Sequence, residues 1–131
     1  MDEVLKFLTR NPIFFFTTMD GDQPRVRPFG AVTKYEGKLY FITSNQKEVY
    51  RQLKINPKVE ICGIDQNENW LRISGKAVMD TRPETVGHML EEMPSLKNIY
   101  SVDDGIAEVF YLTDAEARFC TMGKEPRVVK L

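Results

Sequence analysis

The chain is poor in the residues from which many functional sites are built. Its 131 residues include one histidine, one tryptophan and two cysteines. Cys62 and Cys120 are too few and too far apart for a disulfide framework, and zinc sites usually show paired ligands at short spacing. We therefore expect both cysteines to be reduced thiols of the core and expect no metal site. His88 has no nucleophile or orienting carboxylate at an evident spacing, so we expect it to be structural rather than a general base.

An excess of one charge and long apolar runs are also missing. The formal net charge is -1, so no overall basic field attracts nucleic acid or an anionic membrane, and any anion site must be local. No stretch approaches the ~20 apolar residues of a membrane span. Asp2 and Glu3 stand where a signal peptide carries basic residues. These absences predict a cytoplasmic protein without nucleic-acid or membrane partners. We expect residues 1–131 to form one domain, because the chain shows no repeat or linker.

The chain is rich in strand signals. Apolar segments of strand length occur at 13–18, 25–35, 38–43, 58–64, 70–80, 106–122 and 126–131. Asp20-Gly21 and Glu36-Gly37 predict turns, so the first two strands form an antiparallel hairpin. In the second strand Val26 alternates with Arg25 and Arg27, and we expect Val26 on the core side and the arginines on the other face. Many short antiparallel strands predict a mostly β fold, a small barrel without exposed sheet edges.

Three helical segments flank these strands. A short helix is expected at 2–10, ended by Asn11-Pro12. A second is expected within 45–57, with Ser44 or Asn45 as the cap at its start. A third segment, 81–101, begins with Thr81 and Glu84 at the spacing of a capping box, and Pro94 should divide it into two short helices.

Two features combine positive charge with hydrogen-bond donors. Arg25 and Arg27 stand two residues apart in a predicted strand, a spacing that puts both side chains on one face about 6 to 7 Å apart. In the strand-to-helix passage, Thr43 and Ser44 offer hydroxyls and Lys47 adds charge, while the free amides of a helix start attract anions. Together these features predict a phosphate cradle without the glycine-rich loop of a nucleotide-triphosphate site.

Trp70 and Arg72 form a third feature, on the face opposite to Leu71 and Ile73. An indole and a guanidinium on one face suit a planar aromatic ligand. All three features also have a structural interpretation, because paired arginines commonly bind surface carboxylates and a tryptophan is commonly a packing residue. The residues alone leave both interpretations open.

Taken in order, the segments "FFFTTMDGDQPRVRPFG", "LYFITSNQKEVYRQLKINPKVEIC" and "WLRISGKAVM" resemble the small FMN-binding split-barrel proteins related to pyridoxamine 5'-phosphate oxidase. The resemblance covers residues 1–80, and the C-terminal strands more loosely. Its most specific parts are the Arg-x-Arg-Pro strand and the Thr-Ser-x-x-Lys turn before a helix that ends in Asn-Pro. The resemblance implies a split β-barrel with short flanking helices that holds FMN at a homodimer interface.

The resemblance also implies roles for individual residues. The arginines and Lys47 would approach the phosphate and ribityl chain, Pro28 and Phe29 would lie beside the isoalloxazine, and Thr43 and Ser44 would bond the flavin or its phosphate. Trp70 and Arg72, on the strand at 70–80, are candidates to bind the partner subunit's flavin. The implied cofactor-binding residues are Arg25, Val26, Arg27, Pro28, Phe29, Thr43, Ser44, Lys47, Trp70 and Arg72.

The function implied is that of an FMN-dependent oxidoreductase that acts on a small molecule with an electron donor such as NAD(P)H. Authentic pyridoxamine 5'-phosphate oxidases carry C-terminal arginine and tryptophan motifs, whereas the tail here has Arg127 and no tryptophan. Oxidation of pyridoxamine 5'-phosphate is therefore not expected. A non-enzymatic flavin-binding module, the same barrel with a deazaflavin or haem, and a barrel for single-stranded nucleic acid stay open as alternatives.

Overall fold

The computed structural model describes residues 1–131. In chain order the elements are α1 (Asp2–Arg10), β1 (Phe14–Asp20), β2 (Gln23–Phe29), β3 (Thr33–Tyr35), β4 (Lys38–Ser44), α2 (Glu48–Ile55), β5 (Lys58–Ile64), β6 (Trp70–Met79), α3 (Pro83–Glu92), the 3-10 turn η1 (Pro94–Asn98), β7 (Ala107–Cys120) and β8 (Arg127–Lys130). The order of elements predicted from the sequence is confirmed, including the break before Pro94. None of the helices has the length and apolarity needed to cross a membrane.

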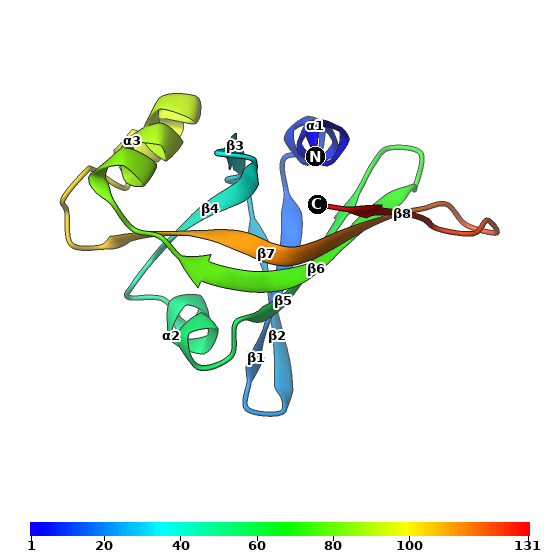
Figure 1. Ribbon diagram of the computed structural model, residues 1–131, viewed down its shortest axis with the longest axis horizontal. Helices are drawn as coiled ribbons and strands as arrows, with labels where there is room; N and C mark the ends of the chain where they lie inside the picture. The colour runs from blue at the N-terminus through cyan, green and yellow to red at the C-terminus, as the bar shows by residue number, and fades with distance from the viewer.

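All eight strands belong to one antiparallel sheet with the order β2-β1-β5-β6-β7-β4-β3, and β8 pairs with β7. The long strand β7 pairs with β6 along one edge. Its other edge is shared, since Ala107–Tyr111 pair with β4 and Glu116–Phe119 pair with β8. Figure 1 shows α1 and α2 on opposite sides of the central strands, with α2 beside the β1–β2 hairpin.

The sheet is curled, so that its two ends lie close together. β2 and β3 are the first and last strands of the order, yet only residues 30–32 join them. The four steps from Phe29 to Thr33 span at most about 14 Å. The strands β1 and β4 are not hydrogen-bonded neighbours, but the rings of Phe16 and Phe41 meet edge to face across the interior at 5.6 Å. The predicted split-barrel fold with short flanking helices is confirmed.

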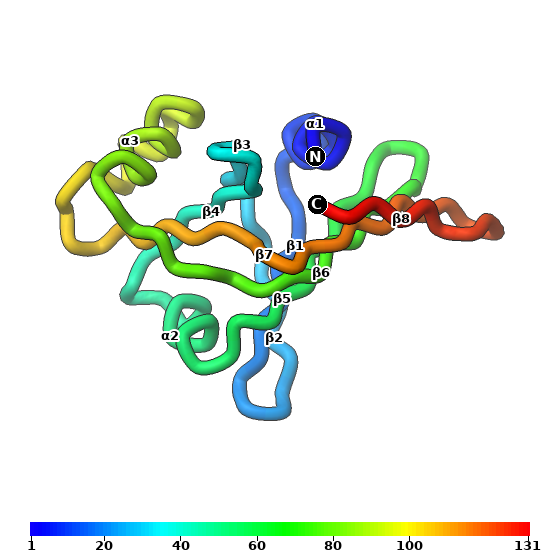
Figure 2. The backbone as a smooth tube through the Cα atoms, viewed as in Figure 1, coloured from blue at the N-terminus to red at the C-terminus, as the bar shows by residue number.

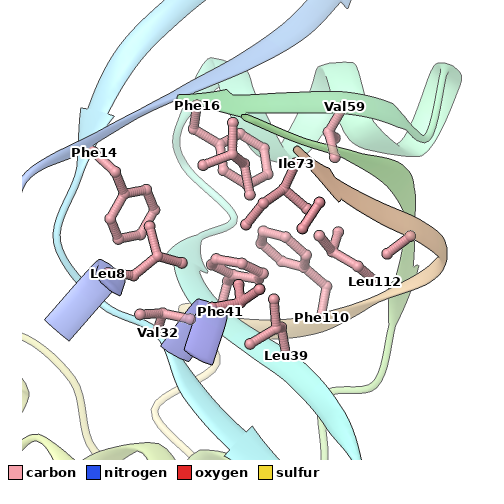
Figure 3. Packing of buried hydrophobic residues seen from close by; sticks show 14 of the residues in the cluster. Leu8, Phe14, Phe16, Val32, Leu39, Phe41, Val59, Ile73, Phe110 and Leu112 are labelled. Atoms are coloured by element: carbon pink, nitrogen blue, oxygen red, sulfur yellow. The ribbon is translucent and has the colours of Figure 1, made fainter. Parts of the chain in front are cut away.

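Aromatic rings fill the interior of the curled sheet. Phe14 and Phe16 of β1 pack against Phe41 of β4, and Phe16 also meets Phe110 of β7 (Figure 3). The helix α1 closes this core with Val4 and Leu8. Burial of one such phenylalanine stabilises the fold by about 1.5–3 kcal/mol. The two chain ends lie beside each other near α1 (Figure 2), where Arg127 is paired with Glu3.

A second, smaller cluster attaches α3 and the following turn to the sheet. Met89 and Leu90 of α3 pack against Tyr40 of β4 and Val109 of β7. Tyr100, which follows η1, is buried in the same cluster. Residues 93–100 are thereby held beside the ends of β2 and β4.

The prediction of which face of β2 points toward the core is wrong. Val26 was expected on the core side, but it is 65% exposed. The reason is the pairing with β1, in which Phe16 lies opposite Arg27 and Phe14 opposite Phe29. Because the phenylalanines of β1 point into the core, the arginine side of β2 faces inward. The predicted strand 25–35 is also divided, since residues 30–32 leave the ladder between β2 and β3.

Two predicted helix caps and one predicted burial are wrong as well. The helix α2 begins at Glu48, after Lys47, and neither predicted residue caps it. The Asn45 side chain donates to Gly105 O and Glu108, and the Ser44 hydroxyl accepts the Gln46 amide. The helix α3 follows Arg82 instead of Thr81, and the Arg82 amide donates to Thr85 Oγ1. Cys120 is buried as expected, whereas Cys62 is half-buried on the outside of the sheet.

Candidate functional site

A cleft of about 440 Å³ opens where the two ends of the curled sheet meet. Its walls come from segments that are far apart in the sequence: residues 27–31 of β2 and its link to β3, the end of β4, the start of α2, and residues 93–100 around η1. Clefts of this size are typical of small-molecule and cofactor sites.

Five of the predicted site residues line this cleft: Arg27, Pro28, Phe29, Thr43 and Lys47. The arginine-containing strand and the strand-to-helix passage therefore line one cleft. Thr43 is nearly fully buried. The ring of Phe29 is stacked on Phe16 at 4.6 Å, which fixes its place in the wall.

Three further predicted residues belong to the same two segments but do not line the cleft. Arg25 is exposed near the tip of the β1–β2 hairpin, where it pairs with Asp20 at 3.4 Å. Val26 points to the opposite side of the sheet. Ser44 is buried, and its hydroxyl accepts the amide of Gln46, which shapes the turn into α2.

Trp70 and Arg72 lie outside this cleft. Arg72 forms a salt bridge with Glu60 across the β5–β6 pair, with 2.7 Å between Arg72 Nη2 and Glu60 Oε2. Trp70 lines a second, more open cleft of about 720 Å³ between α1 and the loop at 65–69. Within one chain these two side chains cannot serve the cleft that Arg27 lines.

Neutral groups hold the Arg27 side chain. Its Nη1 donates to Thr18 Oγ1 at 2.8 Å and to the carbonyl oxygens of Phe16 and Arg25 at 3.2 Å each. Its Nη2 donates to Gln52 Oε1 at 2.9 Å. No carboxylate lies within 4.0 Å of this guanidinium. Burial lowers the pKa of Arg27 from its usual value, because desolvation disfavours the cation.

Lys47 and the start of α2 add to the positive potential of the cleft. Lys47 is the residue before the first turn of α2 and forms no ion pair. The first amides of a helix have no partner within it, and Glu48 and Val49 of this first turn line the cleft. The Glu48 carboxylate also lies there, but it is bound to Arg51. This end of the cleft is therefore suited to an anion.

The rest of the cleft is mainly apolar. Ile42 of β4 and Val49 of α2 line it, as do Leu96 and Ile99 from the segment around η1. Ser95 and Tyr100 are the polar exceptions, and the Tyr100 hydroxyl makes no hydrogen bond within the protein. Burial raises the pKa of Tyr100, so the phenol keeps its proton at neutral pH and can donate.

Sequence reasoning missed Thr18, Gln52 and the residues around η1. A signal existed for Gln52, since it lies on the same helical stripe as Val49 and Leu53 and is therefore a polar residue on a buried face. Residues 93–100 gave no such signal, because only the second core cluster places them beside β2.

Two other polar groups in the fold lie away from the cleft. The Tyr40 hydroxyl donates to Asp80 at 2.7 Å, and Arg82 binds the same carboxylate through two nitrogens. His88 packs its ring against Tyr35 with 4.4 Å between the centroids. His88 is not among the residues that line the cleft, so it offers no base there.

Comparisons with known proteins agree with this fold. The family model described as pyridoxamine 5'-phosphate oxidase matches residues 1–111. A NimC/NimA family protein from Clostridium acetobutylicum is 46% identical, with a TM-score of 0.95 over 100% of this chain and 92% of that chain. No curated protein matches the sequence.

Two more distant structures share the fold. An FAD-binding protein from Mesorhizobium loti is 14% identical, with a TM-score of 0.64 over 91% of this chain and 94% of that chain. A heme binding protein from Mycobacterium smegmatis is also 14% identical, with a TM-score of 0.75 over 95% of this chain and 55% of that chain. At this identity the likeness concerns the fold alone.

Proposed function

We propose that this protein, which belongs to the pyridoxamine 5'-phosphate oxidase family, binds FMN in the cleft lined by Arg27 and Lys47. We further propose that it acts as an FMN-dependent oxidoreductase on a small molecule. Its fold is shared by flavin-binding and haem-binding proteins, and the chemistry of the cleft favours the flavin.

The observation that carries the proposal is the state of Arg27. It is the one partly buried arginine without a carboxylate partner, since Arg82, the other half-buried arginine, is bound to Asp80. A desolvated cation without a counter-ion is costly. A phosphate group that enters the cleft supplies the missing charge.

The other lining residues fit the rest of FMN. Arg27, Lys47, the Thr43 hydroxyl and the first amides of α2 would hold the phosphate. The apolar side chains of Phe29 and Leu96 would take the flat ring system. The cleft thus offers charged and polar groups for the phosphate and apolar side chains for the ring system.

A bound FMN supplies the redox chemistry, so the protein needs no catalytic histidine or cysteine. The side chains of Leu96 and Ile99 would exclude water from the ring. The Tyr100 hydroxyl, free and protonated, would donate a hydrogen bond to the ring or to a substrate above it. The expected reductant is NADH or NADPH.

The test begins with the visible spectrum and the mass of the small molecule released from the purified protein by heating. The proposal expects a flavin spectrum and the mass of FMN, and bleaching of the bound flavin when NADH or NADPH is added without oxygen. A flavin that binds but is not reduced by either donor supports a non-enzymatic flavin-binding module. A protein that takes up no FMN at all refutes the proposal.

Haem is the second candidate, because Met93 and Tyr100 line the cleft and both residue types can ligate haem iron. The more common ligands, histidine and cysteine, do not line it. The same spectrum separates haem and a deazaflavin from FMN.

We also propose that the protein is a homodimer. On the side of the sheet opposite to the core, which we term the outer face, the register aligns Pro28, Phe15, Cys62 and Arg72 in one row across β2, β1, β5 and β6. Phe15 and Val26 on this face are 45% and 65% exposed. Exposed apolar side chains that neighbour one another favour this face as the dimer interface.

A dimer through the outer face also gives Trp70 and Arg72 a role. The register puts both positions on this side of β6, so a partner seated there would contact them. Pro28 belongs to this face and also lines the cleft, so a partner seated around Pro28 would lie beside the cleft. These two residues can then contribute to the partner's flavin site, as the family resemblance implies.

The outer face is tested by Val26→Asp, with Ile55→Asp as the matched control. Ile55 is 75% exposed on α2 and does not belong to the outer face. Sedimentation equilibrium should show a dimer for the wild type and the control and a monomer for Val26→Asp. A dimer that survives in Val26→Asp at the same concentration places the interface elsewhere.

A further inference from the structure

The Arg27 guanidinium is held by acceptors that carry no charge. Thr18 offers a hydroxyl, Gln52 an amide oxygen, and Phe16 and Arg25 offer backbone carbonyls. The other arginines with side-chain partners, such as Arg72 and Arg82, are bound to carboxylates. The site therefore fixes the orientation of Arg27 without neutralising its charge.

Gln52 is the centre of this arrangement. It is 3% exposed on the inner stripe of α2, and its Oε1 accepts both Arg27 Nη2 at 2.9 Å and Thr18 Oγ1 at 2.5 Å. Arginine can only donate, so the amide oxygen must face Arg27. Thr18 is fully buried on β1. The three side chains tie β1, β2 and α2 together beside the cleft.

We propose that Gln52, together with Thr18, is a positioning residue that makes the cleft select phosphorylated ligands over the same ligand without its phosphate. This inference rests on the proposed function. A neutral acceptor at this place holds the guanidinium in one orientation and leaves its full charge for the ligand. A carboxylate at the same place would bind Arg27 more strongly but would cancel its charge.

Neutral partners also prepare the site before a ligand arrives. Folding has already desolvated Arg27 and fixed its rotamer, so the ligand does not bear this cost on binding. A flexible, solvated arginine would lose side-chain entropy each time a phosphate binds. The selectivity thus depends on residues that do not contact the ligand themselves.

The test is Gln52→Glu, which keeps the shape of the side chain and changes one amide to a carboxylate. Dissociation constants for FMN and for riboflavin are measured by flavin fluorescence on the wild-type and variant proteins. We expect FMN to bind about tenfold or more weakly to the variant, because one charge-assisted contact is lost. Riboflavin, which has no phosphate, should bind within about twofold of the wild type because its contacts are unchanged.

If Gln52→Glu does not fold, a second pair of variants tests the same positioning role. Thr18→Val removes the hydroxyl at nearly constant volume, and Thr18→Ser retains it. Thr18→Val should weaken FMN and leave riboflavin unchanged, whereas Thr18→Ser should bind FMN as the wild type does. A merely structural role would weaken both ligands alike.

The outcomes separate this inference from the proposed function. If wild-type protein does not bind FMN, the proposed function fails and the inference fails with it. If wild-type protein binds FMN but the ratio of FMN to riboflavin affinity is the same in Gln52→Glu and Thr18→Val, the proposed function stands and the positioning role is refuted.

Discussion

The assignment of the phosphate end of the cleft is tested by the double variant Arg27→Ala, Lys47→Ala. Both side chains line the cleft, come from different elements and lack a carboxylate partner. Neither belongs to the aromatic core. The variant should therefore remain folded and lose its hold on FMN.

The size of the loss follows from the environment of each cation. Arg27 is half-buried, so its contact with a phosphate is a charge-assisted hydrogen bond worth about 1.5–3 kcal/mol. Lys47 is exposed to solvent, and an exposed ion pair contributes about 0–1 kcal/mol. The sum of about 1.5–4 kcal/mol corresponds to a dissociation constant raised about 10- to 700-fold.

The assay is a titration of the flavin-free protein with FMN, followed by flavin fluorescence at fixed ionic strength. Arg25→Ala is the matched control, because Arg25 is on the same strand but is exposed and bound to Asp20. Its effect on the FMN dissociation constant should be less than about fivefold, since an exposed charge is screened by solvent. Circular dichroism and sedimentation should show that both variants keep the wild-type fold and assembly.

Two results would refute the reasoning. In the first, the double variant keeps FMN at wild-type affinity, which means that the phosphate is not held at this end of the cleft. In the second, Arg25→Ala has the larger effect, which means that the anion lies at the hairpin tip. Loss of FMN together with loss of folding would show that the hydrogen bonds from Arg27 to Thr18, Gln52 and the backbone are needed for the fold.

The remaining predictions concern stability. Tyr40→Phe should lower the free energy of unfolding by about 1.5–3 kcal/mol in urea titrations, because the buried hydroxyl donates to the Asp80 carboxylate. The hydrogen bonds from Arg82 hold the pKa of Asp80 below its usual value, so this stabilisation is present above about pH 4 and is lost as the pH falls further; Asp80→Asn should flatten that part of the pH profile, and an unchanged slope would argue against the pair. Phe41→Ala should cost about 3–5 kcal/mol, because it leaves a cavity among the core rings; a cost below 1 kcal/mol in urea would mean that the core closes over the gap.

The order of helices and strands follows from local signals. Asp20-Gly21 and Glu36-Gly37 give turns whose glycines have φ of 64° and 77° in the structure. Pro94 ends α3 because a proline cannot continue the helical hydrogen bonds. Signals of this kind act within a few residues, so a single sequence is enough to place them.

The candidate site was predicted in part. The two stretches that supply Arg27, Thr43 and Lys47 were identified from their donors and charge, and the cleft contains all three. Arg25 was identified by the same criteria but lies at the hairpin tip with Asp20. The spacing of residues along one strand does not show which of them will lie beside the other elements that form the cleft.

What the sequence alone determined is the succession of elements and, through the family resemblance, the split-barrel class; it also predicted a local anion site, which stays a prediction. Only the tertiary structure decided which face of β2 points inward. Alternation along a strand defines two faces, but the pairing of Arg27 with Phe16 of β1 selects the buried one. The neutral partners of Arg27, Thr18 and Gln52, are likewise 9 and 25 residues away in sequence, and they meet only because the sheet curls and α2 packs against it.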